Sequence, residues 1–261
     1  MGATPRLGPV ISSSTPLLDK YLGDRRFLLT LPRAVTLQVL HPAIAAALAQ
    51  HVHNRLWDHK RRAVSQMIYM AYGKSDPSPV IRFGHEHVKG VTSTGRRYHA
   101  LKPDIFFFQH ATYVDTLVTA INTFSEPLTQ YGHERLYDEC CLWYARYGVS
   151  TRPMPATWAD FTAYFTEACA SQLALTEHCS QLLSQALRPS TWVPSRLPGL
   201  GVRGVQHPRA CELLDIRQNS WERTAFAIYA RAIRSQFAMT PHRARYVSQA
   251  RRRSDLTSSK G

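Results

Sequence analysis

The chain has 261 residues, 44% of them hydrophobic, and a formal net charge of +14 at pH 7. This length and composition are those of an ordinary globular protein, built as one large domain or two small ones. Residues 1–21 lack a basic segment followed by an apolar one, so we expect no signal peptide. No window reaches the roughly 18 uninterrupted apolar residues of a membrane span. A cytoplasmic protein is therefore expected.

Cysteine and charge patterns narrow the class of protein further. The five cysteines, an odd number without a CxxC pair, favour reduced thiols over a disulfide framework or a zinc module. Lys and Arg outnumber Asp and Glu by 15 to 7 in residues 1–125, fall behind by 3 to 7 in residues 126–187, and lead by 14 to 4 in residues 188–261. The basic C-terminal region either contacts nucleic acid or an anionic lipid surface, or is a solvated helix with a frayed end. No signature of specific nucleic-acid binding is present, so no such partner is expected.

Apolar residues recur at helical spacing through most of the chain, whereas strand-like alternation is nearly absent. The dipeptide His41–Pro42 is typical of a helix start, with the histidine side chain as its cap. Residues 89–98 predict a glycine-bounded loop or short hairpin. Further helices are predicted over residues 106–124, from the N-cap Thr157 onward, and over residues 221–237.

Prolines cluster at residues 153–155 and 189–208 and interrupt the helical pattern without marking a clean domain boundary. We predict a single all-α helical domain with a central cavity over residues 21–242. Residues 1–20 are predicted to be an N-terminal extension, and residues 243–261 a basic polar tail.

Histidines on apolar helix faces are the main chemical signal. His85 shares its face with Ile81, and Arg82 lies close to that face. Gly84 directly precedes His85, although a glycine inside a helix is less favourable than alanine by about 1 kcal/mol. Close approach of a flat cofactor to the backbone would explain that glycine. With no cysteine nearby, the pattern suits a haem better than zinc, and the competing interpretation is a core histidine bonded to a carbonyl.

His110 is the second candidate, because its whole helix face is apolar. It is expected to lie near bound oxygen, to be an alternative axial ligand, or to be part of the core. His87 lies about 200° around a helix from His85, so the two cannot hold one metal from a single face. The residue spacings of two other kinds of site, a di-iron centre and a dinucleotide-binding loop, do not fit this sequence. Glu-x-x-His pairs of a di-iron bundle are absent, and the G-x-G-x-x-G match at residues 199–204 follows prolines rather than a strand.

Four segments carry a resemblance to a known family. They are residues 32–45 around Leu37-Gln-Val-Leu-His-Pro42, Arg82-x-x-His85-x-x-Val88-x-Gly90, Tyr98-His-Ala-Leu-x-Pro103, and His110-Ala-Thr-x-Val-Asp115. Over about residues 20–240 the sequence resembles the MpaB-type oxygenases and the rubber oxygenase (latex clearing protein), a family formerly described as a domain of unknown function.

The resemblance implies an all-helical fold that holds haem b through a histidine and uses O2, in some members to cleave carbon–carbon double bonds of isoprenoid chains. By motif, the axial iron ligand would be His85, in a haem-sized cavity. The basic residue near the distal haem face maps to Arg62, while Ala63 stands where an Arg-Thr pair is common. Arg62 or His110 would stabilise bound O2 by a charge-assisted hydrogen bond. Arg33 or Arg82 is further expected near the haem propionates.

We therefore expect a haem b-dependent oxygenase that acts with O2 on an apolar small molecule, such as an isoprenoid or another lipid-like compound. The alternative is a non-catalytic helical binding protein for a lipid-like ligand or an anionic surface, motivated by the basic C-terminal region and by Ala63. Weak contact with an anionic membrane and a location peripheral to it are compatible with both. Cleavage and hydroxylation both fit these residues, as do His85 and His110 as the axial ligand.

Overall fold

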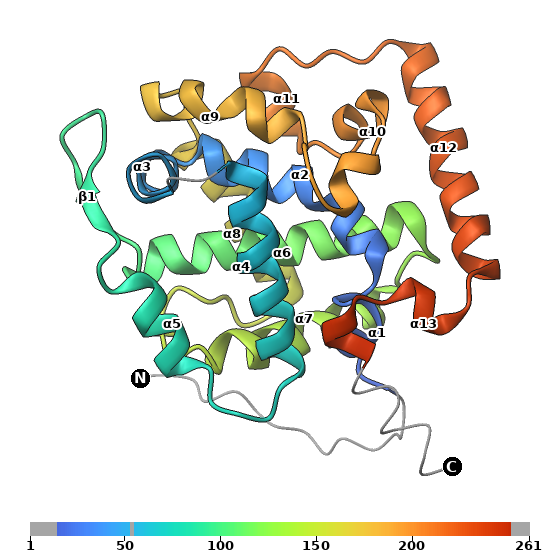
Figure 1. Cartoon of the computed structure of the whole chain (residues 1–261), viewed down its shortest axis with the longest axis horizontal. Helices are drawn as coiled ribbons and strands as arrows, with labels where there is room; N and C mark the ends of the chain where they lie inside the picture. The colour runs from blue at the N-terminus through green and yellow to red at the C-terminus, as the bar shows by residue number, and fades with distance from the viewer. Residues whose placement is uncertain (1–14, 53–54, 252–261) are drawn as a thin grey trace.

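The computed structural model describes residues 15–52 and 55–251 (Figure 1). This part of the chain contains 14 helices and two short strands, which confirms the predicted all-α fold. In chain order the helices are α1 (Leu17–Tyr21), α2 (Arg25–Leu40), α3 (Pro42–His51), α4 (Leu56–Tyr72), α5 (Ser78–His85), α6 (Pro103–Phe124), α7 (Gln130–Ala145), α8 (Trp158–Gln172), α9 (Glu177–Leu187), the 3-10 helix η1 (Val193–Arg196), α10 (Gly199–Gly204), α11 (Pro208–Leu213), α12 (Ser220–Met239) and α13 (His242–Arg245). The strands β1 (Lys89–Val91) and β2 (Arg97–His99) form one antiparallel hairpin, with Lys89 opposite His99.

The core is built around α2 and α6, which pack against each other along most of their length. Figure 1 shows α6 running across the centre of the molecule, with the β hairpin and α12 at opposite edges. Both central helices are rich in Leu, Val, Phe and Ala, and they bury residues on all sides because other helices cover them. Among the polar side chains buried between them, Gln38 of α2 donates to the hydroxyl of Thr112 of α6 at 2.8 Å.

Local signals in the sequence predicted several helix ends correctly. The imidazole of His41 caps α3 by accepting from the backbone N–H of Ile44 at 3.4 Å. Thr157 caps α8 through the backbone N–H of Asp160, at 3.1 Å. The predicted hairpin is present. These features depend on neighbours in sequence, which explains why sequence reasoning found them.

The outer helix α12 packs only part of its apolar face against the core. Ile228 is 63% exposed, whereas Ala230 is buried and Phe226, Tyr229 and Ile233 are half-buried against the core. Phe226 lies directly against Gly204, where any side chain would collide with the aromatic ring. Phe226 also contacts Phe124 of α6, so packing against both α10 and α6 decides which face of α12 is buried.

Both ends of the described chain pack together. Residues 243–251, assigned from sequence to a polar tail, return to the N-terminal helices, where the backbone N–H of Val247 donates to the carbonyl of Gly23 at 3.0 Å. Val247 and Ala250 are buried there. Residues 1–14 and 252–261, the remainder of the predicted extension and tail, lie outside the described residues.

Among the described helices, none is by itself long and apolar enough to cross a bilayer. The pair α2 and α3 meets the length and composition criteria only jointly, with a bend of 97° between the two helices.

Candidate functional site

A cavity of about 190 Å³ lies between α4, α5 and α6, and we call it the His85 cavity. It brings together His85, Gly84 and His110, three of the residues predicted from the sequence. Its lining is otherwise mostly apolar: Ala63, Gln66, Met67 and Met70 come from α4, Val80 and Ile81 from α5, Phe106, Gln109 and Tyr113 from α6, and Tyr147 from the segment after α7. Gln66 and Val80 are exposed, so the cavity opens to the surface between α4 and α5.

His85 is held at the end of α5 in a defined tautomer. Asp76 fixes the start of this helix by accepting from the backbone N–H and the hydroxyl of Ser78, at 2.9 and 2.8 Å. One turn before the histidine, the carbonyl oxygen of Ile81 lies 2.8 Å from Nδ1 of His85. A carbonyl only accepts, so Nδ1 carries the proton and Nε2 keeps a free lone pair. Burial lowers the pKa of His85, which favours the neutral form that ligates a metal.

His110 lies in the wall of the same cavity, inside an aromatic cage. Its ring centroid is 4.5 Å from that of Trp143 and 5.0 Å from that of Tyr144. One ring nitrogen bonds to the carbonyl of Cys140, whereas Nδ1 has no partner among the described residues. Burial lowers the pKa of His110 to about 3. The imidazole is therefore neutral at pH 7, with Nδ1 as an acceptor.

Gly84 lines the cavity on α5 and is exposed. A Cβ atom built on this glycine would meet no other heavy atom within 4 Å. The residue is therefore not required by protein packing, in contrast to Gly204 under Phe226. The open space beside the backbone is the kind of surface that a flat molecule can approach closely.

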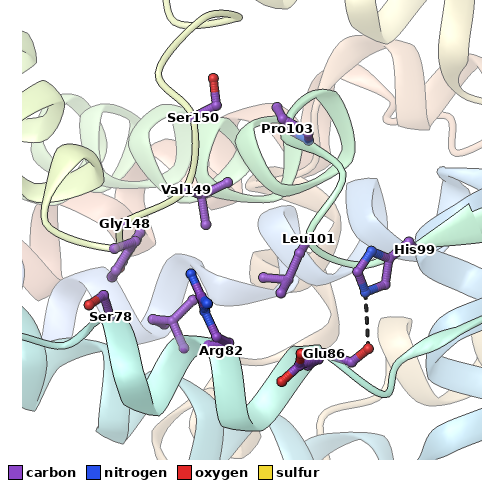
Figure 2. Close-up of a pocket in the computed structure, with 11 residues that line it drawn as sticks. Ser78, Arg82, Glu86, His99, Leu101, Pro103, Gly148, Val149 and Ser150 are labelled. Carbon is purple, nitrogen blue, oxygen red and sulfur yellow. Dashed lines mark hydrogen bonds between the residues drawn. The ribbon is translucent and has the colours of Figure 1, made fainter.

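A second pocket of about 270 Å³ lies on the other side of α5 and shares Ile81 and Tyr147 with the His85 cavity (Figure 2). It is more polar, and Figure 2 shows the guanidinium of Arg82 extending across it toward Gly148 and Val149. Its remaining lining residues are Ser78, Glu86, His99, Leu101, Pro103 and Ser150. Arg82 thus belongs to the helix that separates a polar pocket from an apolar cavity.

Comparison with known proteins shows the family. A family model for the catalytic domain of the ER-bound oxygenase mpaB/B' and the rubber oxygenase matches residues 20–235. The chain belongs to this oxygenase family. No curated protein and no solved structure gives a significant match. The match includes α2 to α11 in full, and with them every residue of the His85 cavity.

Rubber oxygenases are generally associated with haem, and the side chains of this family member fit such a group. His85 offers a neutral Nε2, the space over Gly84 is open, and His110 presents an unpaired nitrogen. The described residues contain no cluster of three or more His, Cys, Asp or Glu suited to a metal ion. Haem ligation does not need such a cluster, because one or two side chains suffice.

Two arginines predicted to act in this oxygenase lie outside the cavity. Arg62 is exposed on α4, next to the lining residue Ala63. Arg33 is held between α2 and α6 by an ion pair with Asp115 and by a hydrogen bond to the carbonyl of Val205 at 3.2 Å. Arg33 lines neither pocket. Of the two arginines considered for the propionates, only Arg82 lies on a helix that walls the cavity.

Sequence reasoning missed a buried amine behind the cavity wall. Lys60 on α4 is only 2% exposed, and its Nζ donates to Oε1 of Gln38 at 2.6 Å. Burial lowers the pKa of Lys60 to about 7. A signal was present, because Lys60 falls within the apolar stripe of α4, which also contains Leu56, Trp57, Val64 and Met67. A lysine at helical spacing within such a stripe is buried unless its stem reaches the surface.

Proposed function

We propose that this chain is a haem b-dependent oxygenase that uses O2 on an apolar small molecule of isoprenoid or other lipid-like type. The observation that carries the proposal is the hydrogen bond from Nδ1 of His85 to the carbonyl of Ile81, beside the open backbone of Gly84. This arrangement leaves Nε2 free at an apolar cavity, within a segment that matches an oxygenase family. Partner hydrogen bonds of this kind are typical of histidines that ligate metals.

In this proposal the residues of the chain have distinct roles. His85 would hold the haem iron, and the carbonyl of Ile81 would fix its ring orientation. A bound haem supplies the redox-active iron at which O2 chemistry occurs. Met67 and Phe106 would contact the apolar substrate and exclude water. Neutral His110 would accept a hydrogen bond at Nδ1 rather than donate one.

Arg82 is the proposed partner of a haem propionate that would reach the polar pocket past Ile81 and Tyr147, the two residues that line both pockets. Arg62 is the proposed distal group, and its exposed side chain would fold over the mouth of the cavity. We further propose a cytoplasmic location, peripheral to a membrane from which a lipid-like substrate would be taken.

An ultraviolet–visible spectrum of protein expressed with ample haem tests the proposal. The wild type is expected to bind about one haem per chain, with a Soret band that shifts on reduction and on addition of carbon monoxide. His85→Ala should lose that spectrum. His87→Ala is the matched control, since His87 is exposed and lines neither pocket, and it should bind like the wild type. An unchanged spectrum in His85→Ala would overturn the ligand assignment.

A non-catalytic binding protein is the second candidate, and the surface of α12 and α13 favours it. Between residues 216 and 251 the sequence has seven arginines and one acidic residue. Trp221, Ile228 and Met239 are exposed on α12. Cosedimentation with anionic vesicles at low and high salt tests this function. Absence of binding at low salt would remove it.

A further inference from the structure

The buried amine of Lys60 is joined to the wall of the His85 cavity by one intervening side chain. Nζ of Lys60 donates to Oε1 of Gln38 at 2.6 Å, and Nε2 of Gln38 donates to Oγ1 of Thr112 at 2.8 Å. The hydroxyl of Thr112 in turn donates to the carbonyl oxygen of Gln109 at 2.7 Å. Gln38 also makes a side-chain hydrogen bond with Tyr113. Gln109 and Tyr113 both line the cavity.

No carboxylate balances this amine within the described part of the chain. On the helices around it, acidic side chains are paired elsewhere or exposed: Asp24 with Arg26, Asp115 with Arg33, and Asp104 and Glu177 at the surface. On α4, the half-buried Asp58 forms no ion pair with Lys60, and the titratable groups His59 and Arg62 would add like charge rather than neutralise it. Burial alone accounts for the lowered pKa of Lys60.

Burying an amine without a counter-charge costs desolvation free energy that an apolar side chain would not incur. An apolar side chain of similar volume would remove the desolvation penalty and is often neutral or stabilising at such positions. Packing alone therefore does not explain a lysine at this position. Its effect on the orientation of the neighbouring Gln38 amide does explain it. An ammonium group has three donors and no acceptor, so it accepts nothing from Gln38 and fixes the direction of the Gln38 amide.

The observed hydrogen bonds agree with this orientation of the Gln38 amide. The oxygen of the Gln38 amide faces Lys60, and its nitrogen faces α6. The second N–H of this amide is then free for the hydroxyl oxygen of Tyr113, which leaves the hydroxyl proton of Tyr113 available to another acceptor. A neutral lysine also accepts hydrogen bonds, so the constraint on Gln38 is lost when the proton leaves.

We propose that Lys60 is a positioning residue that, through Gln38, holds the hydroxyl of Tyr113 as a hydrogen-bond donor to an oxygen atom bound in the His85 cavity. The hydroxyl of Tyr113 is held as a donor when Lys60 is charged, and it is released from this orientation when Lys60 is neutral. Since neutral His110 presents only an acceptor at Nδ1, Tyr113 supplies the hydrogen-bond donor in the cavity wall. The inference rests on the proposed function only in treating the cavity as the reaction site, because the hydrogen bonds exist without haem.

The test is carbon-13 NMR of the full chain labelled at Cζ of tyrosine and prepared without haem. The Tyr113 signal is identified as the one missing in Tyr113→Phe. In the wild type it is expected to shift in one step with a midpoint near pH 7, the pKa of Lys60. Burial raises the pKa of Tyr113 itself, and the pKa of His110 is about 3, so neither group titrates in this range.

Two substitutions of Lys60 distinguish a role in positioning Tyr113 from a role in packing alone. Lys60→Met should remove the step, and Lys60→Arg, which stays charged, should hold the signal at its low-pH position throughout. Lys102→Met is the matched control, because the Lys102 side chain is 59% exposed, and it should titrate like the wild type. A Tyr113 signal that does not move in the wild type, or that moves unchanged in Lys60→Met, would overturn the proposal. Either result leaves the haem-binding test unaffected.

Discussion

The guanidinium of Arg33 in α2 and the carboxylate of Asp115 in α6 form a two-point ion pair, with N–O distances of 2.6 and 3.0 Å. Their side chains are only 11% and 16% exposed. The pair therefore joins the two central helices at a place where water screens it poorly. This position gives Arg33 a role in the fold rather than at the propionates.

Replacing Arg33 by Met should destabilise the protein by about 3 kcal/mol or more, because Asp115 would remain buried without its partner. Haem stoichiometry at low temperature should be unchanged. Urea unfolding followed by circular dichroism measures the first effect, and Soret absorbance measures the second. Loss of haem from a variant that is still folded would restore Arg33 to the cofactor site. Arg33→Met combined with Asp115→Leu should recover part of the lost stability.

Gly84→Ala should have opposite effects on the fold and on the cofactor. Nothing lies within 4 Å of the added Cβ, and alanine favours a helix by about 1 kcal/mol relative to glycine, so α5 should be stabilised in haem-free protein. Haem affinity should fall, because the methyl group occupies the open space beside His85. Gly204→Ala is the contrasting control and should destabilise through Phe226. Unchanged haem affinity in Gly84→Ala would show that the ring does not approach this backbone.

Buried histidines should make the protein sensitive to acid. Burial lowers the pKa of His41 and His207 to about 4 and that of His59 and His110 to about 3, from 6.5 in an unfolded chain. Between these values the unfolded state binds more protons, so stability is complete above pH 6.5 and falls as the pH decreases. Each histidine contributes up to about 1.4 kcal/mol per pH unit. Urea midpoints between pH 4 and 7 should show a shallower slope in His110→Phe than in the wild type.

Lys60 should make the stability of the protein depend on pH above 7 rather than below it. Its pKa is lowered from 10.5 to about 7, so the unfolded state binds more protons between these values and stability should rise as the pH increases from 7 to 10. Lys60→Met should be more stable than the wild type at pH 7, with the difference shrinking as the pH rises. Urea unfolding of both proteins at pH 7, 8.5 and 10 measures this. Equal stability at all three values would contradict the burial of a lysine without a counter-charge.

The sequence by itself determined the features that depend on neighbours along the chain. Helical periodicity, the caps at His41 and Thr157 and the hairpin at residues 89–98 are set within one or two turns of backbone. His85, Gly84 and His110 were also found from sequence, because motif order and apolar spacing mark them, and the structure brings them to one cavity.

Only the tertiary structure decided which polar side chains of distant helices pair with one another. Arg33 meets Asp115, Lys60 meets Gln38, and Phe226 of α12 packs on Gly204. Each outcome depends on which helix packs on which face, a property of contacts far apart in sequence. Periodicity shows that a helix has an apolar face, but packing decides what that face meets and which charges are left without a partner.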